Sequence, residues 1–311
     1  MFNLVVPDFN IKSGNLGYAI LKGLLAFQLT VPLSSEEPPS SLSAGLLPII
    51  SHFIATVKSV ESLQQVTLKL ASVTKVKESP SVEVWQEQRN LEAIELADIV
   101  LLSCQSSEVA GILSVPGVRA ALSGKLLLSV CLGISTPKLV ELLDLASMER
   151  ACTIVYAMPN TASKIQQSST TICRYASDPE LSPTISKLVN NIFSSIGAFT
   201  VIPEHLMTAA TVTAASSPAF FALALKGVIE GAVAKGMPRE KATIMAAQAM
   251  KGTAELVLRG EDPKVVMREV MTPKGCSEKG VHVLQNGGVY ELYVESVRVS
   301  TEMANEMERC Q

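Results

Sequence analysis

Up to about residue 202, short runs rich in β-branched residues alternate with segments whose apolar residues recur at helical spacing. Eight runs are predicted as strands: Leu4 to Ile11, Phe53 to Val57, Val82 to Trp85, Asp98 to Ser103, Lys125 to Cys131, Thr153 to Ala157, Thr170 to Arg174 and Phe199 to Ile202. Five segments are predicted as helices: Asn15 to Phe27, Val60 to Ala71, Ser107 to Leu122, Pro137 to Leu145 and Pro183 to Phe193. This alternation is typical of βαβ units on a parallel sheet.

One connection does not fit a compact βαβ unit. Residues 31–51, VPLSSEEPPSSLSAGLLPIIS, carry four prolines and a cluster of serines, which favour turns over regular structure. We therefore expect an irregular insertion between the first helix and the second strand.

After Pro203 the pattern changes, and Ala-rich and Met-rich segments at helical spacing continue almost to the C-terminus. We predict two domains: an α/β domain at 1–202 that contains the insertion 31–51, and an all-α domain at 203–311. The many small residues of the second domain let helices approach closely. Its apolar character fits either an ordinary packed bundle or a face buried in a partner subunit.

Composition narrows the classes of partner. The chain has 26 basic and 29 acidic residues, a net charge of −3 and no long run of one sign, which argues against nucleic acid and anionic membranes. Hydrophobic residues make up 48% and mean hydropathy is +0.32, yet the apolar stretch from Thr208 to Leu225 is interrupted by Pro218 and rich in Thr and Ser. It does not read as a membrane span, and the N-terminus lacks signal-peptide features. We expect a cytoplasmic protein with a small-molecule substrate.

Residues that commonly bind metals or act as nucleophiles are scattered. The six cysteines contain no CxxC pair, and His52, His205 and His282 lie far apart with no carboxylate at ligand spacing. No GxSxG motif occurs. We predict no metal site and a structural role for the histidines.

A glycine motif at the first strand-to-helix turn points to a nucleotide. The sequence Lys12-Ser13-Gly14-Asn15-Leu16-Gly17 lies where a dinucleotide-binding fold has GxGxxG. Gly14 and Gly17 match the second and third glycines, but Lys12 replaces the first. The Lys12 side chain could neutralise a phosphate or fill the cleft. A strand-to-helix turn without any ligand remains an equal alternative.

Taken together and in order, several segments resemble the pyrroline-5-carboxylate reductase family over almost the whole chain. They are SGNLGYAILKGLL, ADIVLLSCQ, GKLLLSVCLGIS, AMPNTASKI, SSPAFFALALKGVIEGAVAKGMPREKA and MTPKGCSEKGVHVLQNGGV. The proline-rich insertion resembles that of fungal members. The resemblance implies a Rossmann-like N-terminal domain, helical C-terminal domains that dimerise, and NAD(P)H-dependent reduction of the C=N bond of a cyclic imine to make proline.

The resemblance also implies a cofactor site, although this chain departs from the family pattern there. The candidate cofactor-binding residues are Ser13, Gly14, Asn15, Leu16, Gly17, Lys58, Gln105, Met158, Pro159 and Asn160. Lys58 keeps one of the cations that receive the 2′-phosphate of NADPH, Gln105-Ser106 replaces a Lys-Pro pair, and Tyr156 replaces an arginine. Loss of a neighbouring cation reduces the expected preference for NADPH. The cofactor is therefore expected to be NADP(H) or NAD(H), unless its binding has been lost.

The substrate site implied by the resemblance is altered too. The candidate substrate-binding residues are Ser216, Ser217, Pro218, Lys274, Gly275, Cys276 and Ser277. The first three correspond to a GSGP turn at a helix N-terminus, which would offer N–H groups to a carboxylate. The other four correspond to a PGGTT loop. As catalytic residues the resemblance suggests Ser277, as a proton donor, and Asn160, beside the nicotinamide.

Scaffold segments thus match the family while ligand positions differ, a pattern expected where a fold is retained and its site rebuilt. We hold two main hypotheses. The favoured one is an NAD(P)H-dependent reductase of a cyclic imine, in fungal specialised metabolism, because Gly14, Gly17, Lys58 and the MPNT segment are kept. The alternative is a cofactor-degenerate member that catalyses a cyclisation or isomerisation on the same dimeric fold. A third is an inactive paralogue that acts through dimerisation.

Overall fold

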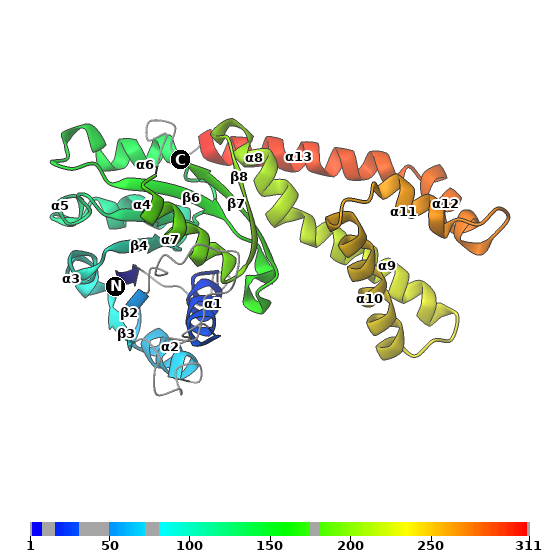
Figure 1. Cartoon of the computed structure of the whole chain (residues 1–311), viewed down its shortest axis with the longest axis horizontal. Helices are drawn as coiled ribbons and strands as arrows, with labels where there is room; N and C mark the ends of the chain where they lie inside the picture. Colours follow the sequence, from blue (N-terminus) through cyan, green and yellow to red (C-terminus); the bar gives the residue numbers. More distant parts are fainter. Residues whose placement is uncertain (1, 8–15, 31–49, 72–80, 175–180, 310–311) are drawn as a thin grey trace, which may run out of the picture. The chain divides into compact units, whose positions relative to one another are not determined.

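An eight-stranded sheet organises the N-terminal part of the molecule, in the strand order β3-β2-β1-β4-β5-β6-β7-β8 (Figure 1). The strands are β1 (Phe2–Val6), β2 (Ile50–Val57), β3 (Ser81–Gln86), β4 (Ile99–Leu102), β5 (Leu126–Ser129), β6 (Thr153–Met158), β7 (Ser168–Arg174) and β8 (Gly197–Ile202). Strands β1 to β6 are parallel and have the 3-2-1-4-5-6 order of the doubly wound dinucleotide-binding fold. Strand β7 runs antiparallel to β6, so the sheet is mainly rather than wholly parallel.

The structure, a computed structural model, describes residues 2–7, 16–30, 50–71, 81–174 and 181–309. By their internal contacts the residues fall into two units, Met1–Ala215 with Met303–Gln311, and Ser216–Glu302. The first unit is an α/β domain of Rossmann type.

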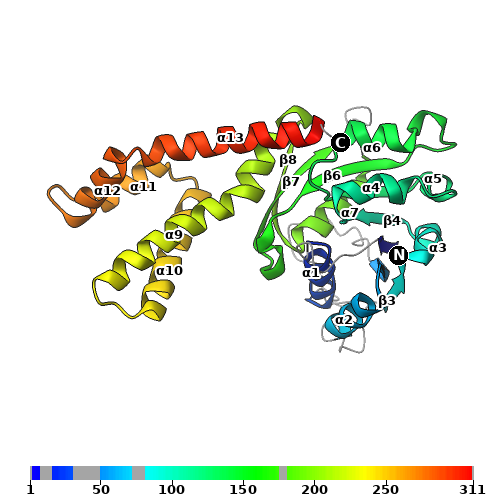
Figure 2. The ribbon, with the colours of Figure 1, turned by 180° about the vertical axis from the view of Figure 1, so that it is seen from behind.

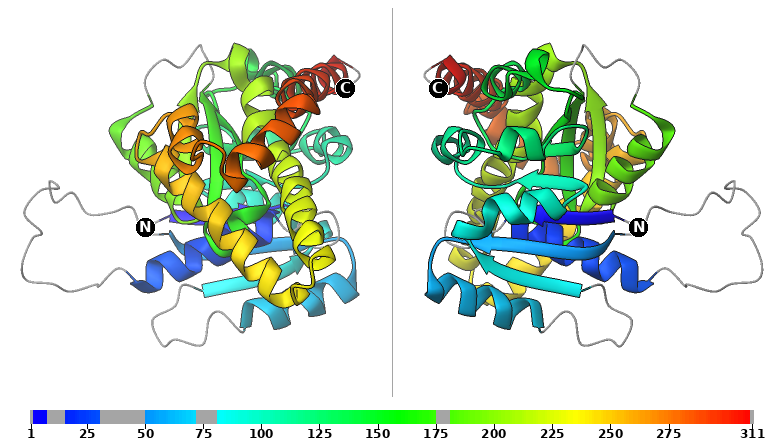
Figure 3. Two further views of the ribbon diagram at one scale, coloured as in Figure 1. Left: turned by 90° about the vertical axis from the view of Figure 1, so that its right-hand side faces the viewer. Right: turned by 90° about the vertical axis from the view of Figure 1, so that its left-hand side faces the viewer.

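Two apolar cores lie on the two faces of the sheet, because successive strand residues point to opposite sides. Leu4 and Leu101 enter one core, whereas Val5 and Val100 enter the other. The first core is completed by helices α1 (Leu16–Thr30), α2 (Val60–Ala71) and α7 (Pro183–Ser194). The second core is completed by α3 (Asn90–Leu96), α4 (Ser106–Leu113), α5 (Val118–Ala121) and α6 (Thr136–Leu143), as the opposite views also show (Figures 2 and 3).

Several predicted boundaries are wrong. The first strand ends at Val6 because Pro7, which has no N–H to donate to a sheet, follows it. The last two residues of the predicted insertion, Ile50 and Ser51, belong to β2, and residues 31–49 lie outside the described part of the chain. The remaining strand ends shift by up to three residues, as in β2, which begins at Ile50 rather than Phe53.

The helix predicted from Ser107 to Leu122 is also wrong. The chain forms α4 and α5 with a break between them, because Gly117 adopts a φ of 93°, in the left-handed region where glycine is favoured. Helix α3 was not predicted at all. With seven residues it is too short for a clear helical period.

The second unit contains only helices among its described residues. They are α9 (Ser217–Ala234), α10 (Arg239–Leu258), α11 (Pro263–Val270), α12 (Cys276–Asn286) and α13 (Val289–Arg309), the last of which ends in the first unit. Helices α9 and α10 pack side by side (Figure 2). The C-terminal region is therefore all-α, as predicted.

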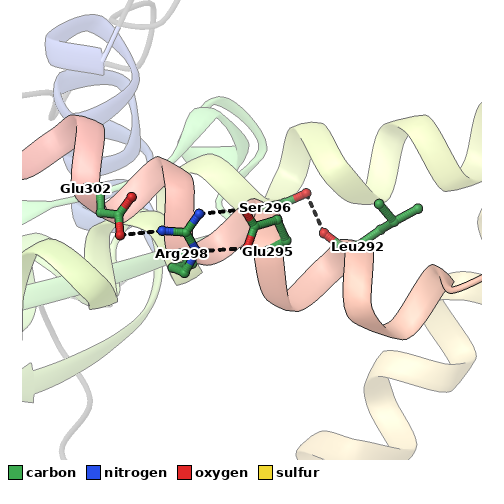
Figure 4. Close-up of polar contacts among 5 residues, drawn as sticks. All are labelled: Leu292, Glu295, Ser296, Arg298 and Glu302. Carbon is green, nitrogen blue, oxygen red and sulfur yellow. Dashed lines mark hydrogen bonds and ion pairs between the residues drawn. The ribbon is translucent and has the colours of Figure 1, made fainter.

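Helix α13 carries one charged stripe. Arg298 donates to Glu295 through Nε and Nη2, at 2.8 and 2.6 Å, and to Glu302 through Nη1 at 2.5 Å (Figure 4). All three side chains are about half exposed. Ion pairs at this spacing stabilise a helix only slightly, so the stripe marks the face that remains in water.

Most large apolar side chains of the second unit are exposed. They include Phe221, Leu223, Val228, Ile244, Met245, Leu258, Val283, Leu284, Tyr290, Leu292, Val294 and Val299. The helical stretch Glu204–Ala234 is also long and apolar enough to cross a membrane by length and composition, a weak signal because one such stretch passes the same test in proteins of other kinds. An exposed apolar area of this extent marks an interaction surface.

Candidate functional site

A hollow of about 370 Å³ lies where strands β2 and β3 end and α4 passes by. It is lined by Lys58, Glu87, Asn90, Glu108, Gly111, Ile112 and Val115. In doubly wound sheets, dinucleotides bind outside the carboxyl ends of the strands, near the point where the strand order reverses, here between β1 and β4. Of the predicted cofactor residues, Lys58 lies in this hollow. Its partners Glu108, Asn90 and Glu87 were not predicted.

Lys58 directly follows β2 and is held by α4. Its Nζ lies 2.5 Å from Oε1 of Glu108, while Oε2 of Glu108 accepts the backbone N–H of Gln105 at 3.0 Å. Gln105 is thus the N-terminal cap of α4 and is exposed, and Glu108 closes a capping box with it. The predicted cofactor residue Gln105 is therefore linked to Lys58 through Glu108, which contacts both.

A hydrogen bond from β2 holds Asn90, one of the polar lining residues of the hollow. The Thr56 hydroxyl, which is fully buried in β2, donates to Oδ1 of Asn90 at the start of α3. The opposite wall is apolar, and a Cβ built on Gly111 would meet nothing within 4 Å. The apolar part of the lining is therefore open at Gly111, and polar side chains line the same hollow.

The phosphate turn lies mostly outside the described residues. This applies to Lys12, Ser13, Gly14 and Asn15. The other two candidates, Leu16 and Gly17, form the first residues of α1, and Gly17 is buried. A helix therefore starts where the glycine motif predicts one, and its N-terminus is the end that favours an anion.

The hydrogen bonds of Asn160 hold the loop that follows β6. The side-chain Oδ1 accepts the N–H of Ala162 at 2.9 Å and caps the 3-10 segment Thr161–Ile165, while Nδ2 donates to the carbonyl of Ala214 at 2.9 Å. The backbone N–H donates to Ser168 at 3.0 Å. Asn160, Pro159 and Met158 are all buried.

The bond from Asn160 to Ala214 follows from Pro218. Helix α8 (Met207–Thr211) continues through a π-helical segment, Val212–Ser216, directly into α9. In an α-helix the N–H of residue 218 would bond the carbonyl of residue 214, but proline has no N–H. Asn160 supplies the missing donor. Ser216, Ser217 and Pro218 therefore lie at the N-terminal end of α9, as expected, although a π-helical segment leads directly into that end.

The second predicted substrate loop begins α12. Lys274 has a φ of 63° and its backbone N–H donates to Oε2 of Glu278 at 2.6 Å. Gly275 must remain glycine, because a Cβ there would lie 2.3 Å from Oγ1 of Thr272. Cys276 is exposed and Ser277 half-exposed in the first turn. Glu278, which was not predicted, thus accepts a backbone N–H of the predicted substrate loop.

Ser277 lines a second hollow, of about 260 Å³. The other lining residues, mostly apolar, are Thr253, Pro263, Val266, Met267, Val270, Met271 and Val281. All of these residues belong to the helical unit, so the hydroxyl groups of Ser277 and Thr253 lie in an otherwise apolar lining.

Tyr156 occupies the position where the resemblance expects an arginine. It is almost fully buried in β6, and burial raises the pKa of its hydroxyl far above the ordinary value. A tyrosine carries no positive charge at any pH, so the position lacks the cation of the family pattern, and burial keeps the hydroxyl neutral. Packing with Met158, Cys173 and Met207 explains why the substitution is tolerated.

Comparison with known proteins gives the family. The chain is 39% identical to the pyrroline-5-carboxylate reductase of Neurospora crassa over 305 residues, which cover 94% of this chain and 90% of that protein. The chain belongs to the pyrroline-5-carboxylate reductase family. Residues 204–307 match the family model described as pyrroline-5-carboxylate reductase dimerisation. A second relative, the pyrroline-5-carboxylate reductase of Lophium arboricola, is 39% identical over 96% of this chain and 92% of its own.

A solved structure shares the fold. The Plasmodium falciparum pyrroline carboxylate reductase with NADP bound superimposes with a TM-score of 0.74 at 21% identity, covering 99% of this chain and 98% of that chain. The fold predicted from the sequence, a Rossmann-like domain with an all-α dimerisation domain, is confirmed.

Proposed function

We propose that this protein is an NAD(P)H-dependent reductase of a cyclic imine. Membership of the pyrroline-5-carboxylate reductase family supports this proposal, and so does the solved relative that holds NADP. The observation that carries it is the hollow at Lys58. This hollow has both apolar and polar lining residues and lies at the carboxyl edge of the sheet, which suits the adenosine half of a dinucleotide. We propose Lys58 and Gln105, with Glu108 and Asn90, as residues of that half.

For the other half we propose the phosphate turn from Ser13 to Gly17 and the loop of Met158, Pro159 and Asn160. When bound, the reduced nicotinamide supplies a hydride. Because the amide of Asn160 is engaged with Ala162 and Ala214, its proposed role is to hold this loop in place. Orientation of this kind accounts for much of the catalysis in cofactor enzymes.

We propose that the substrate contacts Ser216, Ser217, Pro218 and the loop from Lys274 to Ser277. The Ser277 hydroxyl is the candidate proton donor to the imine nitrogen, directly or through water. Since the Glu278 carboxylate accepts the N–H of Lys274, a negative charge lies at this loop, which makes it less favourable for a substrate carboxylate. We therefore propose a changed cyclic imine, in specialised metabolism, and a cytoplasmic location.

We further propose a homodimer built by the C-terminal helices. The match of residues 204–307 to the family's dimerisation region supports it. So do the exposed apolar residues of α9, α10, α12 and α13, which a second copy would cover.

The test is an assay of purified protein with NADH or NADPH and a panel of cyclic imines, both with and without a carboxylate. We expect imine-dependent oxidation of the dinucleotide and a product that mass spectrometry finds two hydrogens heavier. Ser277→Ala should lower kcat and leave the Kd of the dinucleotide unchanged. An imine that is cyclised or isomerised while the dinucleotide stays reduced would refute the proposal in favour of redox-neutral chemistry.

A further inference from the structure

The polar groups of the nucleotide hollow carry more negative than positive charge. Its charged lining residues, among those that the structure describes, are Lys58, Glu87 and Glu108. The Glu108 carboxylate is 2.5 Å from Nζ of Lys58, so the lysine that follows β2 is already neutralised by the protein itself. The resemblance instead assigns this lysine to the 2′-phosphate of NADPH.

Glu108 is held firmly in this position. One carboxylate oxygen binds Lys58 and the other accepts the N–H of Gln105, so both oxygens are fixed. Its side chain is only 20% exposed, against 47% for Lys58, so water screens the pair less than an open surface pair. Position in the first turn of α4 further stabilises the negative charge, because the helix dipole is positive there.

Arg89, the cationic residue between Glu87 and Asn90 in the sequence, interacts with residues that do not line the hollow. The guanidinium of Arg89 stacks on the Trp85 ring, with Cζ 3.5 Å from the ring centroid. It also donates to both oxygens of Glu92, at 2.7 and 2.6 Å. Arg89 therefore does not make up for the positive charge of Lys58 that Glu108 neutralises.

We propose that Glu108 makes this enzyme select NADH over NADPH. The inference rests on the proposed function, because it requires that a dinucleotide occupy the hollow. A 2′-phosphate would have to displace a carboxylate from Lys58 and would then lie between Glu108 and Glu87. A ribose 2′-hydroxyl has the opposite chemistry, since it donates a hydrogen bond that a carboxylate accepts.

Sequence alone did not reveal this residue. Lys58 and Glu108 are 50 positions apart, and Lys58 taken by itself suggests the opposite preference. The spacing of Gln105 and Glu108 is that of a capping box, which places Glu108 in the first turn of a helix but not against Lys58.

Calorimetric titration with NADH and NADPH tests the proposal without measuring turnover. We expect the wild type to bind NADH at least about tenfold more tightly than NADPH, the scale of one charge-assisted hydrogen bond. Glu108→Gln keeps an oxygen acceptor for Gln105 and removes the carboxylate charge beside Lys58. It should tighten NADPH by about tenfold while changing the Kd of NADH by less than about threefold. Lys58→Met in the Glu108→Gln background should abolish that gain.

The matched control is Glu92→Gln, which changes net charge equally but removes the partner of Arg89. It should leave the ratio of the two Kd values unchanged. The shift of the unfolding temperature by each dinucleotide gives a second readout of the same ratio. Tighter NADPH than NADH in the wild type, or an unchanged ratio in Glu108→Gln, overturns the selectivity and leaves the reductase proposal standing. Binding of neither dinucleotide at millimolar concentration overturns both.

Discussion

The two units of this chain bury their apolar residues very differently. In the sheet unit, strand residues such as Phe53, Val100 and Leu127 are completely buried between helices on both faces. In the helical unit Ala242 and Val266 are the buried apolar residues among those described, while Leu223 of α9 is 71% exposed. The sheet unit therefore contains its own core, whereas the helical unit lacks one in a single copy of the chain.

The difference has a local cause in the sequence. Strand residues alternate between two covered faces, so every apolar side chain of β1 or β4 has a core to enter. Helix α9, in contrast, is apolar over most of its surface apart from Lys226 and Glu230, and Phe221, Leu223 and Val228 are each at least half exposed. A helix that is apolar over most of its surface usually has much of that surface covered by other elements. The helical unit thus leaves exposed an apolar surface that fits the dimer proposed above.

The strongest way to break this comparison is to charge the exposed face of α9. We expect Leu223→Arg to halve the particle mass in sedimentation equilibrium, because a buried guanidinium without a partner opposes association. Activity should fall with it if the dimer supports the site. The matched control is Leu68→Arg in α2, where the leucine is 73% exposed in the sheet unit. Unchanged mass in Leu223→Arg would show that the apolar face of α9 is covered in some other way.

A substitution at Asn160 tests how much its hydrogen bonds contribute to the stability of the sheet unit. Asn160→Ala leaves the carbonyl of Ala214 and the N–H of Ala162 without their side-chain partner, and because both bonds are only part-buried the two losses together cost about 1–3 kcal/mol. We expect a loss of about 1–3 kcal/mol in the free energy of unfolding, measured with urea. Ser186→Ala is the control, because its hydroxyl makes only a long bond of 3.5 Å to Leu181. Equal stability of the two variants would contradict the role given to Asn160.

The same contrast explains what the sequence could predict. Short β-rich apolar runs predicted β4 and β5 to within a few residues, and the helical period predicted α2 at the observed bounds. Both signals are local, so they need no knowledge of the partner elements. The antiparallel β7 carried no such signal, since the direction of a strand depends on its connection rather than on its own side chains.

The candidate site was less predictable because its contacts are long-range. The sequence motifs pointed to Lys58, but they gave no sign that Glu108 forms an ion pair with it. It assigned Asn160 to catalysis, although the geometry shows both ends of its amide engaged in holding the loop. The missing N–H of Pro218 was the available signal, since proline inside a helix leaves a carbonyl that needs another donor.

The C-terminal end of α13 is the exception within the helical region, because its last turns belong to the sheet unit. Partial burial and the nearby charge of Glu204 raise the pKa of Glu308 above its ordinary value, and Tyr156 lines the same small cavity. The folded protein therefore keeps a proton that the unfolded chain loses, so this contribution to stability is present at low pH and is lost as pH rises through the raised pKa.

Glu308→Gln should therefore flatten the fall in unfolding free energy as pH rises above the ordinary pKa of a glutamate, a small effect because solvent still reaches the carboxyl group. Urea unfolding at a series of pH values measures it. Glu306→Gln, on the exposed side of the same helix, is the control and should keep the wild-type slope. If both variants keep that slope, the end of α13 is not packed against the sheet unit in solution, and the helix belongs wholly with the region that a second copy covers.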